Sequence, residues 1–165
     1  ANTFLLAKGF NVGRSLVETD MLEMAKSILK KGNCILPTEV FTAKSLNDHD
    51  ATKKSIDSIE DDDLILDINV DSSYKKILDT ANTIIWNGPA GVFEKEGFKN
   101  GTKNLSSFIA SSNAFSIAGG GETIAAINEF IDPIDIGYIS TAGGAFLEFL
   151  EGKKLPALEA LGYDF

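Results

Sequence analysis

Short apolar runs alternate with amphipathic segments along the second half of the chain, and this alternation predicts strands and helices in turn. The apolar runs predict strands at 83–86, 114–118 and 138–140. Apolar residues with helical spacing predict helices at 98–111, 123–130 and 144–150. Strands that alternate with helices in this way are typical of a parallel sheet covered by helices. The pattern therefore predicts an α/β fold.

A longer helix is predicted near the start of the chain, over residues 16–31. Ser15 and Glu18 have the spacing of a capping box, and Gly32 provides a stop signal. The apolar face of this helix is expected to consist of Met21, Leu22, Ala25, Ile28 and Leu29. Residues 2–7 resemble the middle of a helix without its entry signals, which leads us to expect a further N-terminal portion.

The segment between this helix and the alternating region is mixed. Short strands are predicted at 33–40 and 41–43, and the continuous apolar run 64–68 predicts a buried strand. The polar residues 45–63 are expected to form surface structure. A short helix is then expected from a cap at Asp71 or Ser72 through Ala81.

Charge and cysteine content narrow the range of partners. The chain has 24 acidic and 15 basic residues and a net charge of −9, so it repels nucleic acid phosphates and anionic membrane surfaces. No apolar run approaches the ~20 residues that a membrane span needs. Cys34 is the only cysteine, which excludes an internal disulfide and fits a reducing cytoplasm. We therefore expect no nucleic acid and no membrane partner.

Three glycine-bearing loops each follow one of the strands predicted in the alternating region. They are Trp86–Glu94, Gly119–Thr123 and Ser140–Gly144. Backbone N–H groups in such loops, together with the start of the following helix, favour phosphate binding. In a single loop, the glycines would more often serve only to allow a tight turn. Because ligands of open parallel sheets bind outside the carboxyl ends of the strands, three such loops predict one shared nucleotide crevice.

Two acidic residues in these loops are candidates for ligand binding. Glu122 begins a predicted helix, where its carboxylate either meets a magnesium ion on the nucleotide phosphates or only stabilises the first turn. Glu94 ends its loop, where it either accepts hydrogen bonds from ribose hydroxyls or is simply solvated. His49 lies between Asp48 and Asp50, and a solvated loop is favoured there over a metal site.

Two common nucleotide motifs and most cations are missing from the chain. It contains neither a Walker A motif nor Gly-x-Gly-x-x-Gly, and the lack of the second weakens the case for a Rossmann-type oxidoreductase. No Lys or Arg occurs between Asn104 and Gly152, and Arg14 is the only arginine. Phosphoryl transfer needs cations that balance the developing charge. We therefore expect a clamp for a second phosphorylated substrate to lie elsewhere.

The loop sequences resemble those of the phosphoglycerate kinase family. The matching residues, in order and spacing, are Trp86–Pro89 with Gly91–Glu94, Gly119–Gly121, and Ser140–Thr141 with Gly143–Gly144. The resemblance covers nearly the whole chain, and it implies a Rossmann-like parallel sheet with helices on both faces, in three α/β/α layers, incomplete at its N-terminal side. Residues 1–165 would form most of the C-terminal nucleotide-binding domain, with the first strands and the N-terminal substrate domain outside this chain.

The resemblance also implies a reaction. It is the reversible, magnesium-dependent transfer of a phosphoryl group between 1,3-bisphosphoglycerate and ADP, which gives 3-phosphoglycerate and ATP in glycolysis. ATP or ADP would bind to this chain, whereas the phosphoglycerate would bind to the N-terminal domain. The intact enzyme is expected to be a cytoplasmic monomer, and this chain alone is expected to be inactive. The alternative is a non-catalytic nucleotide-binding fragment.

The residues at matching positions receive roles from this resemblance. Glu94 would hold the ribose, Glu122 would serve the magnesium ion, and Leu16 would border the adenine pocket. Gly143 and Gly144 would offer amides to the phosphoryl group during transfer. The other nucleotide contacts would come from Asn87, Pro89, Gly120, Gly121 and Thr123.

The chain departs from the family pattern in three places. Glu122 stands where the family usually has Asp, and its extra methylene is expected to alter magnesium binding without abolishing it. Ala142 replaces a glycine, which predicts strain if the position requires a positive φ. The pair Asn69-Val70 lacks the Gly-Pro of many members, so no nucleotide contact is expected there.

Overall fold

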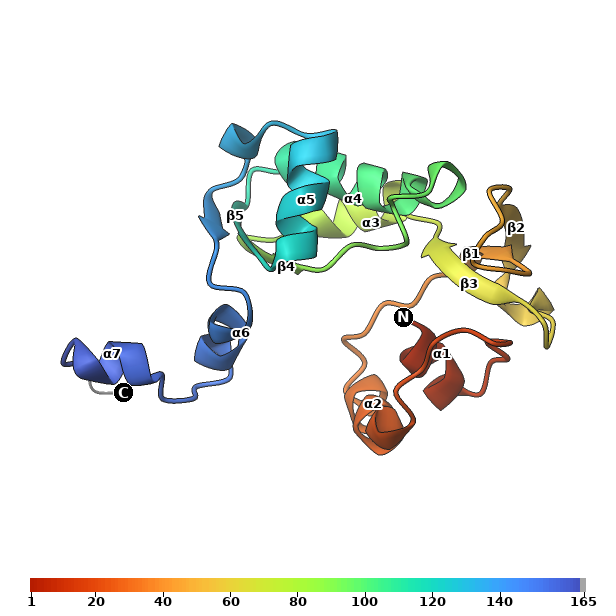
Figure 1. Ribbon diagram of the computed structural model, residues 1–165, viewed down its shortest axis with the longest axis horizontal. Coiled ribbons are helices and arrows are strands. Elements are labelled where there is room, and N and C mark those ends of the chain that lie inside the picture. Colours follow the sequence, from red (N-terminus) through yellow and green to blue (C-terminus); the bar gives the residue numbers. More distant parts are fainter. Residues whose placement is uncertain (164–165) are drawn as a thin grey trace. The chain divides into compact units, whose positions relative to one another are not determined.

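The computed structural model describes residues 1–163, and the chain forms two compact units (Figure 1). The first unit consists of Ala1–Ser72 and Ala90–Leu105. The second unit consists of Ser73–Pro89 and the described residues from Ser106 onward. Each unit has its own sheet.

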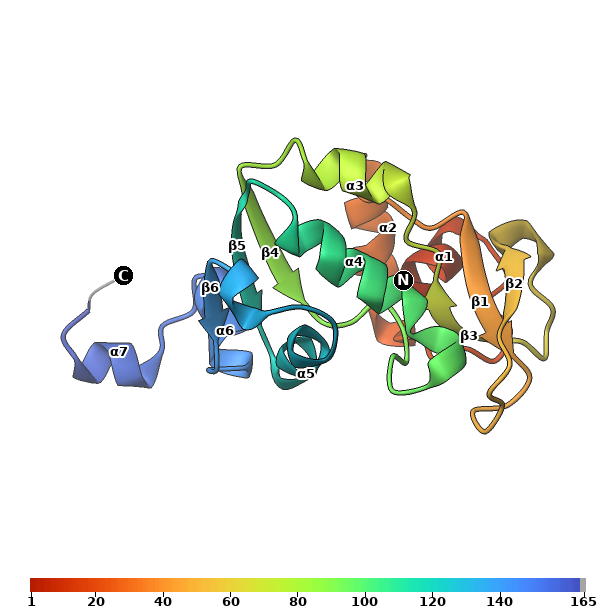
Figure 2. The same cartoon turned by 90° about the horizontal axis from the view of Figure 1, so that it is seen from above.

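The first unit is built on an antiparallel sheet with the strand order β2-β1-β3, visible in Figure 2. Its strands are β1 (Glu39–Ala43), β2 (Thr52–Ser55) and β3 (Leu64–Ile68). Val40 in the central strand lies opposite Lys54 on one side and Ile68 on the other. The register on the β3 side shifts between Phe41 and Thr42, which marks a bulge or irregularity.

Helices α1 (Asn2–Lys8) and α2 (Leu22–Lys30) pack on each other in this unit. Short 3-10 turns lie at Thr19–Met21, Ile56–Ser58 and Glu96–Phe98. One apolar core joins α1 to the sheet, through Leu5, Val12, Val40, Ile56, Ile59 and Ile65. A second cluster packs the fully buried Phe98 against Ala43 and Leu66. The segment that follows Pro89 is thereby anchored on β3.

The second unit contains a parallel sheet with the strand order β4-β5-β6. Its strands are β4 (Thr83–Asn87), β5 (Phe115–Gly119) and β6 (Tyr138–Ser140). The helices are α3 (Ser72–Leu78), α4 (Asn100–Ala110), α5 (Gly121–Phe130), α6 (Gly144–Leu150) and α7 (Pro156–Ala160), with a 3-10 turn at Pro133–Asp135; α3 and α4 begin in the first unit. Side chains alternate along β4, where Ile84 and Trp86 are buried and Ile85 is exposed.

The predicted α/β class and its parallel sheet are confirmed. The predicted strand at 138–140 and helix at 144–150 have the bounds of β6 and α6. Strand β4 ends one residue later than predicted, and β5 begins and ends one residue later than predicted. None of the helices in the described part of the chain combines the length and apolarity that crossing a membrane requires.

The helix predicted over residues 16–31 is wrong in its first turns. The Ser15 hydroxyl is buried and does not cap a helix, because it donates to the carbonyl of Val12 and accepts the N–H of Ile65. The α-helix therefore starts only at Leu22, after a 3-10 turn. Of the face predicted to be inner, only Ala25 is buried.

The strands predicted at 33–40 and 41–43 are also corrected, since one strand, β1, covers Glu39–Ala43. The polar segment 45–63 is less superficial than predicted, because it contains β2 and the buried residues Ile56, Ile59 and Asp63. Strand β2 forms because it pairs with β1, although the local sequence of β2 does not indicate a strand.

Candidate functional site

A cavity of about 300 Å³ in the second unit brings the three glycine loops together. The loops follow β4, β5 and β6, the three parallel strands, so the prediction of one shared crevice is confirmed. The residues that line the cavity are Asn87, Gly88, Gly120, Gly121, Glu122, Thr123, Gly143, Gly144 and Leu147.

Two glycines shape this cavity through backbone conformations that other residues rarely adopt. Gly120 has a φ of +97° and Gly143 a φ of +50°, values in the region that favours glycine. A Cβ at Gly120 would also lie 3.1 Å from Asn87 Nδ2. Glycine at these two positions therefore lets the backbone enter α5 and α6 with a positive φ.

Side-chain hydrogen bonds hold the first two loops against each other. Asn87 Nδ2 donates to the carbonyl of Gly119 at 2.8 Å. The N–H of Gly88 donates to Thr123 Oγ1 at 2.7 Å, and Thr123 is fully buried. The first contact joins the end of β4 to the end of β5, and the second joins the loop after β4 to α5.

The cavity also contains open space beside three of its glycines. A Cβ at Gly121, Gly143 or Gly144 would meet nothing within 4 Å. Glu122 is exposed in the first turn of α5, and in the described chain no ion pair or hydrogen bond engages its carboxylate. A carboxylate beside helix-start amides and free volume has the chemistry of a site for a cation-bound phosphate.

The remaining sequence-predicted residues lie outside this cavity lining. Pro89 ends the first segment of the second unit. Glu94 and Leu16 belong to the first unit, and both are exposed, Leu16 at 83%. Ala142 carries no strain of the expected kind, because no described non-glycine residue has a positive φ, and Gly143 takes the unusual conformation instead.

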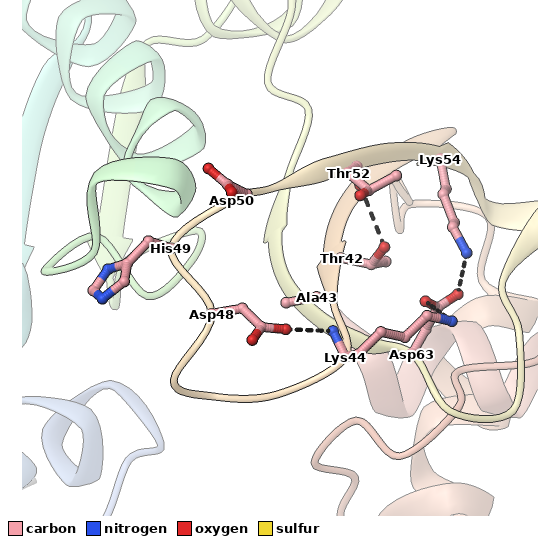
Figure 3. Close-up of a pocket in the computed structure, with 9 residues that line it drawn as sticks. All are labelled: Thr42, Ala43, Lys44, Asp48, His49, Asp50, Thr52, Lys54 and Asp63. Atoms are coloured by element: carbon pink, nitrogen blue, oxygen red, sulfur yellow. Dashed lines mark hydrogen bonds and ion pairs between the residues drawn. The ribbon is translucent and has the colours of Figure 1, made fainter.

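The first unit holds a separate, highly charged cavity of about 360 Å³, shown in Figure 3. Its lining includes Lys44, Lys54 and the buried Asp63. Asp48 accepts the N–H groups of Lys44 and Ser45. The exposed His49 points away from the lysines in the figure. The arrangement supports the interpretation of His49 as part of a solvated loop.

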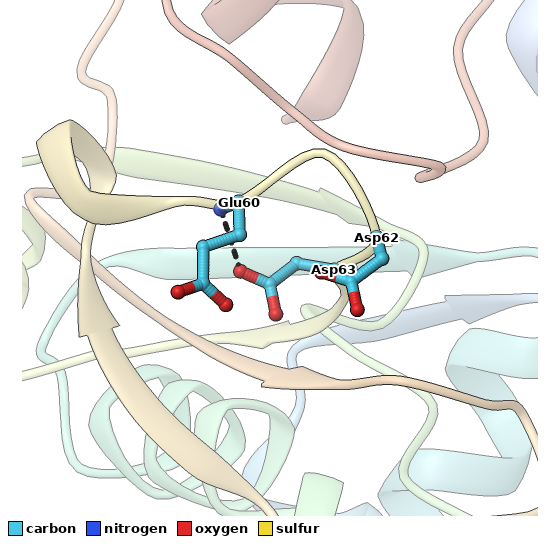
Figure 4. A group of neighbouring side chains, drawn as sticks. All are labelled: Glu60, Asp62 and Asp63. Carbon is cyan, nitrogen blue, oxygen red and sulfur yellow. Dashed lines mark hydrogen bonds between the residues drawn. The ribbon is translucent and has the colours of Figure 1, made fainter.

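Three acidic residues, Glu60, Asp62 and Asp63, gather beside this cavity (Figure 4). Lys44 Nζ lies 2.6 Å from both Glu60 and Asp62 and 3.0 Å from Asp63 Oδ1. Lys54 Nζ lies 2.7 Å from Asp63 Oδ2. Burial opposes ionisation of Asp63, but Lys54, the Glu60 N–H and Lys44 outweigh it and hold its pKa below the usual value. The ammonium groups of Lys44 and Lys54 thus pair with the three carboxylates and form an ion-pair network.

Asp67 is a notable residue that sequence analysis did not single out. It is 1% exposed in β3, and it accepts the N–H groups of Ile68 at 2.9 Å and Gly101 at 2.8 Å. Burial raises the pKa of its carboxyl to about 6, against the effect of these two hydrogen bonds. Its signal in the sequence is a lone acidic residue inside the apolar run 64–68.

Comparison with known proteins gives a consistent match over this chain. The family model described as phosphoglycerate kinase matches residues 1–153. A phosphoglycerate kinase of Francisella philomiragia is 53% identical over 98% of this chain and 43% of that protein. One from Vibrio campbellii is 50% identical over 98% of the chain and 42% of that protein.

Solved structures agree with the sequence matches. The phosphoglycerate kinase of Coxiella burnetii matches with a TM-score of 0.89 and 44% identity, over 96% of this chain and 43% of that one. The enzyme of Pyrococcus horikoshii OT3 matches with a TM-score of 0.82 and 34% identity, over 98% of this chain and 42% of that one. The chain therefore spans less than half the length of these relatives.

Proposed function

The chain belongs to the phosphoglycerate kinase family, and on that basis we propose that it supplies the nucleotide site for phosphoryl transfer. The reaction is the reversible exchange between 1,3-bisphosphoglycerate with ADP and 3-phosphoglycerate with ATP. Residues 1–165 would form most of a C-terminal nucleotide-binding domain, which works with an N-terminal substrate domain. The family match and the short span relative to its relatives support this division.

The observation that carries the proposal is the cavity at the ends of three parallel strands. Its floor is made by loops with little side-chain bulk, and Gly121, Gly143 and Gly144 leave open volume beside the starts of α5 and α6. We assign the nucleotide phosphates to this volume, because amide N–H groups at strand-to-helix turns attract anions. Asn87, Gly120 and Thr123 then line the phosphate path.

Glu122 fits the magnesium ion that the family implies. Its carboxylate is exposed at the cavity and has no protein partner in the described chain. Mg²⁺ is commonly held by one or two carboxylates with phosphate oxygens and water, which is the donor set available here. A bound Mg²⁺ would neutralise phosphate charge as it develops.

The other predicted residues complete the assignment. Gly143 and Gly144 offer backbone amides at the start of α6 to the phosphoryl group. We assign Glu94 to the ribose hydroxyls, Pro89 to the nucleotide site and Leu16 to the border of the adenine pocket. These three assignments rest on the match of the loops to the family pattern.

The cavity has no cation of its own. Neither Lys nor Arg occurs among its lining residues or between Asn104 and Gly152. Amides hold phosphates but do not replace the positive side chains that most phosphoryl transfer requires. We therefore infer that the chain alone is inactive and that the missing cations come from the remainder of the enzyme. The same lack of cations favours the alternative, a nucleotide-binding fragment without catalysis.

A Gly121→Val substitution in the complete enzyme tests the site. The added side chain fills volume that is empty in the protein, so folding should be retained, while affinity for ATP should fall by about tenfold or more. Ser107→Val is the control, because Ser107 is an exposed residue of α4 outside the cavity lining. Calorimetric titration with Mg-ATP measures the change. Equal affinity in both variants would contradict the assignment of the phosphates to this cavity.

A further inference from the structure

Asp67 and its surroundings connect β3 to the loop that carries Glu94, within the first unit. No described Lys or Arg forms an ion pair with Asp67, although its side chain is buried. Two backbone N–H groups are its partners instead, those of Ile68 and Gly101. A buried carboxylate without a cation is energetically unfavourable, so its position calls for a physical reason.

Two glycines allow the backbone to pack directly on this carboxylate. A Cβ at Gly91 or at Gly101 would overlap the Asp67 carboxylate group. Gly91 lies in the loop before Glu94, and Gly101 lies in the first turn of α4. Asp67 therefore acts as a spacer and a hydrogen-bond acceptor between the loop and the helix.

Thr102 holds the same loop from α4. Its Oγ1 is an acceptor for the N–H groups of Ala90 at 3.1 Å and Gly91 at 3.3 Å, and the residue is fully buried. The N–H of Val92 donates to the carbonyl of Leu66 in β3 at 2.8 Å. The loop backbone is thus attached to both β3 and α4.

The attached loop ends in a buried aromatic residue followed by an exposed carboxylate. Phe93 is 4% exposed and anchors the loop in the interior, whereas the next residue, Glu94, is exposed. A carboxylate that begins one residue after such an anchor has a fixed starting point for its side chain. Fixing a ligand-binding group in advance lowers the cost of ordering it on binding.

We propose that Asp67 and Thr102 are positioning residues for Glu94, and that through the Ala90–Phe93 backbone they set how strongly the enzyme recognises ribose hydroxyls. The inference rests on the ribose role proposed above for Glu94. It assigns a function to the buried carboxylate in β3 and to the glycines that face it. Neither residue touches the nucleotide in this account.

The test compares ATP with 2′,3′-dideoxy-ATP in the complete enzyme. The measured quantity is the KM for 2′,3′-dideoxy-ATP divided by the KM for ATP. This KM ratio is larger when the enzyme recognises the ribose hydroxyls more strongly. Glu94→Gln should lower this ratio. Asp67→Asn and Thr102→Val should each lower it by about threefold or more, because each removes an acceptor for a loop or helix N–H. Combining either variant with Glu94→Gln should give no further decrease.

Matched controls separate positioning from general destabilisation. Asp63→Asn and Thr42→Val change a buried Asp and a buried Thr in the same unit, away from the loop. These variants should leave the KM ratio unchanged, even where they reduce the amount of folded enzyme. If Asp67→Asn does not fold, Thr102→Val decides the question by itself.

The outcomes distinguish the inference from the function on which it rests. A ratio that falls in Glu94→Gln but stays unchanged in the folded Asp67 and Thr102 variants overturns the positioning role and leaves the ribose role intact. A ratio unchanged in Glu94→Gln overturns the ribose role, and the positioning role with it. A decrease in the Asp63 and Thr42 controls equal to that in the test variants also overturns the inference.

Discussion

In the function proposed above, a single side chain at the start of α5, that of Glu122, would hold the magnesium ion. The longer side chain is exposed in the first turn of this helix. We therefore expect the extra methylene to displace the carboxylate relative to the metal ion and to leave the fold unchanged. Since Mg²⁺ demands near-octahedral geometry at short distances, a displaced ligand weakens its binding.

We predict that Glu122→Asp in the complete enzyme lowers the Mg²⁺ concentration for half-maximal turnover by several-fold. Glu122→Gln, which keeps the size and removes the charge, should raise this concentration by about tenfold. A magnesium titration of turnover at fixed ATP measures both effects. An Asp variant with the same magnesium dependence as the parent would show that the longer side chain carries no penalty.

Single residues also show where the sequence was informative and where it was not. Gly120, Gly121 and Glu122 could be predicted to lie at the turn from a strand into a helix, because a strand followed by glycines and a helix is a local pattern. Ser15 could not, because its hydrogen bond to Ile65 joins residues that are far apart in the sequence. A capping pattern indicates a helix only where tertiary contacts leave the side chain available.

At the level of elements, β4 and α5 are coupled by a hydroxyl inside the site. Thr123 Oγ1, on a fully buried residue of α5, accepts the N–H of the partly buried Gly88 in the loop after β4. Thr123 therefore has a structural task in addition to its proposed contact with the nucleotide. The two roles are compatible, because a hydroxyl that accepts one hydrogen bond still has a proton to donate.

We predict that Thr123→Val speeds hydrogen exchange at the Gly88 amide by about tenfold in the absence of nucleotide, since removing the acceptor leaves this N–H unpaired. Thr123→Ser keeps the oxygen and should retain most of the protection. Thr83→Val makes the same chemical change at an exposed position of β4 and serves as the control. Exchange at Gly88 that is unaffected by Thr123→Val would contradict the coupling.

The elements differ in how far local sequence determines them. Strands β3 to β6 follow apolar runs, and α6 follows a glycine start, so their positions could be predicted. Strand β2 has the sequence Thr-Lys-Lys-Ser and carries no apolar signal. It exists because Lys54 and its neighbours pair with β1, an interaction between different segments that periodicity does not report.

At the level of the whole chain, the sequence predicted the parallel sheet but not the second sheet. The alternation of strand and helix from residue 83 onward indicates parallel connections. The antiparallel sheet β2-β1-β3 depends on contacts among irregular segments and on apolar residues contributed by α1. The cavity that the three glycine loops share could be predicted, because each loop is a local pattern at the end of a parallel strand.

The most direct test of the central claim is to measure transfer of the phosphoryl group from ATP to 3-phosphoglycerate in two polypeptides, with the products detected as ADP and 1,3-bisphosphoglycerate. One is this chain alone, and the other is this chain joined to the N-terminal portion of the enzyme. We predict turnover only in the joined polypeptide and its loss there on Gly121→Val. Turnover by the chain alone, or a folded joined polypeptide that binds ATP without turnover, would contradict the claim that this chain is the nucleotide half of a phosphoglycerate kinase.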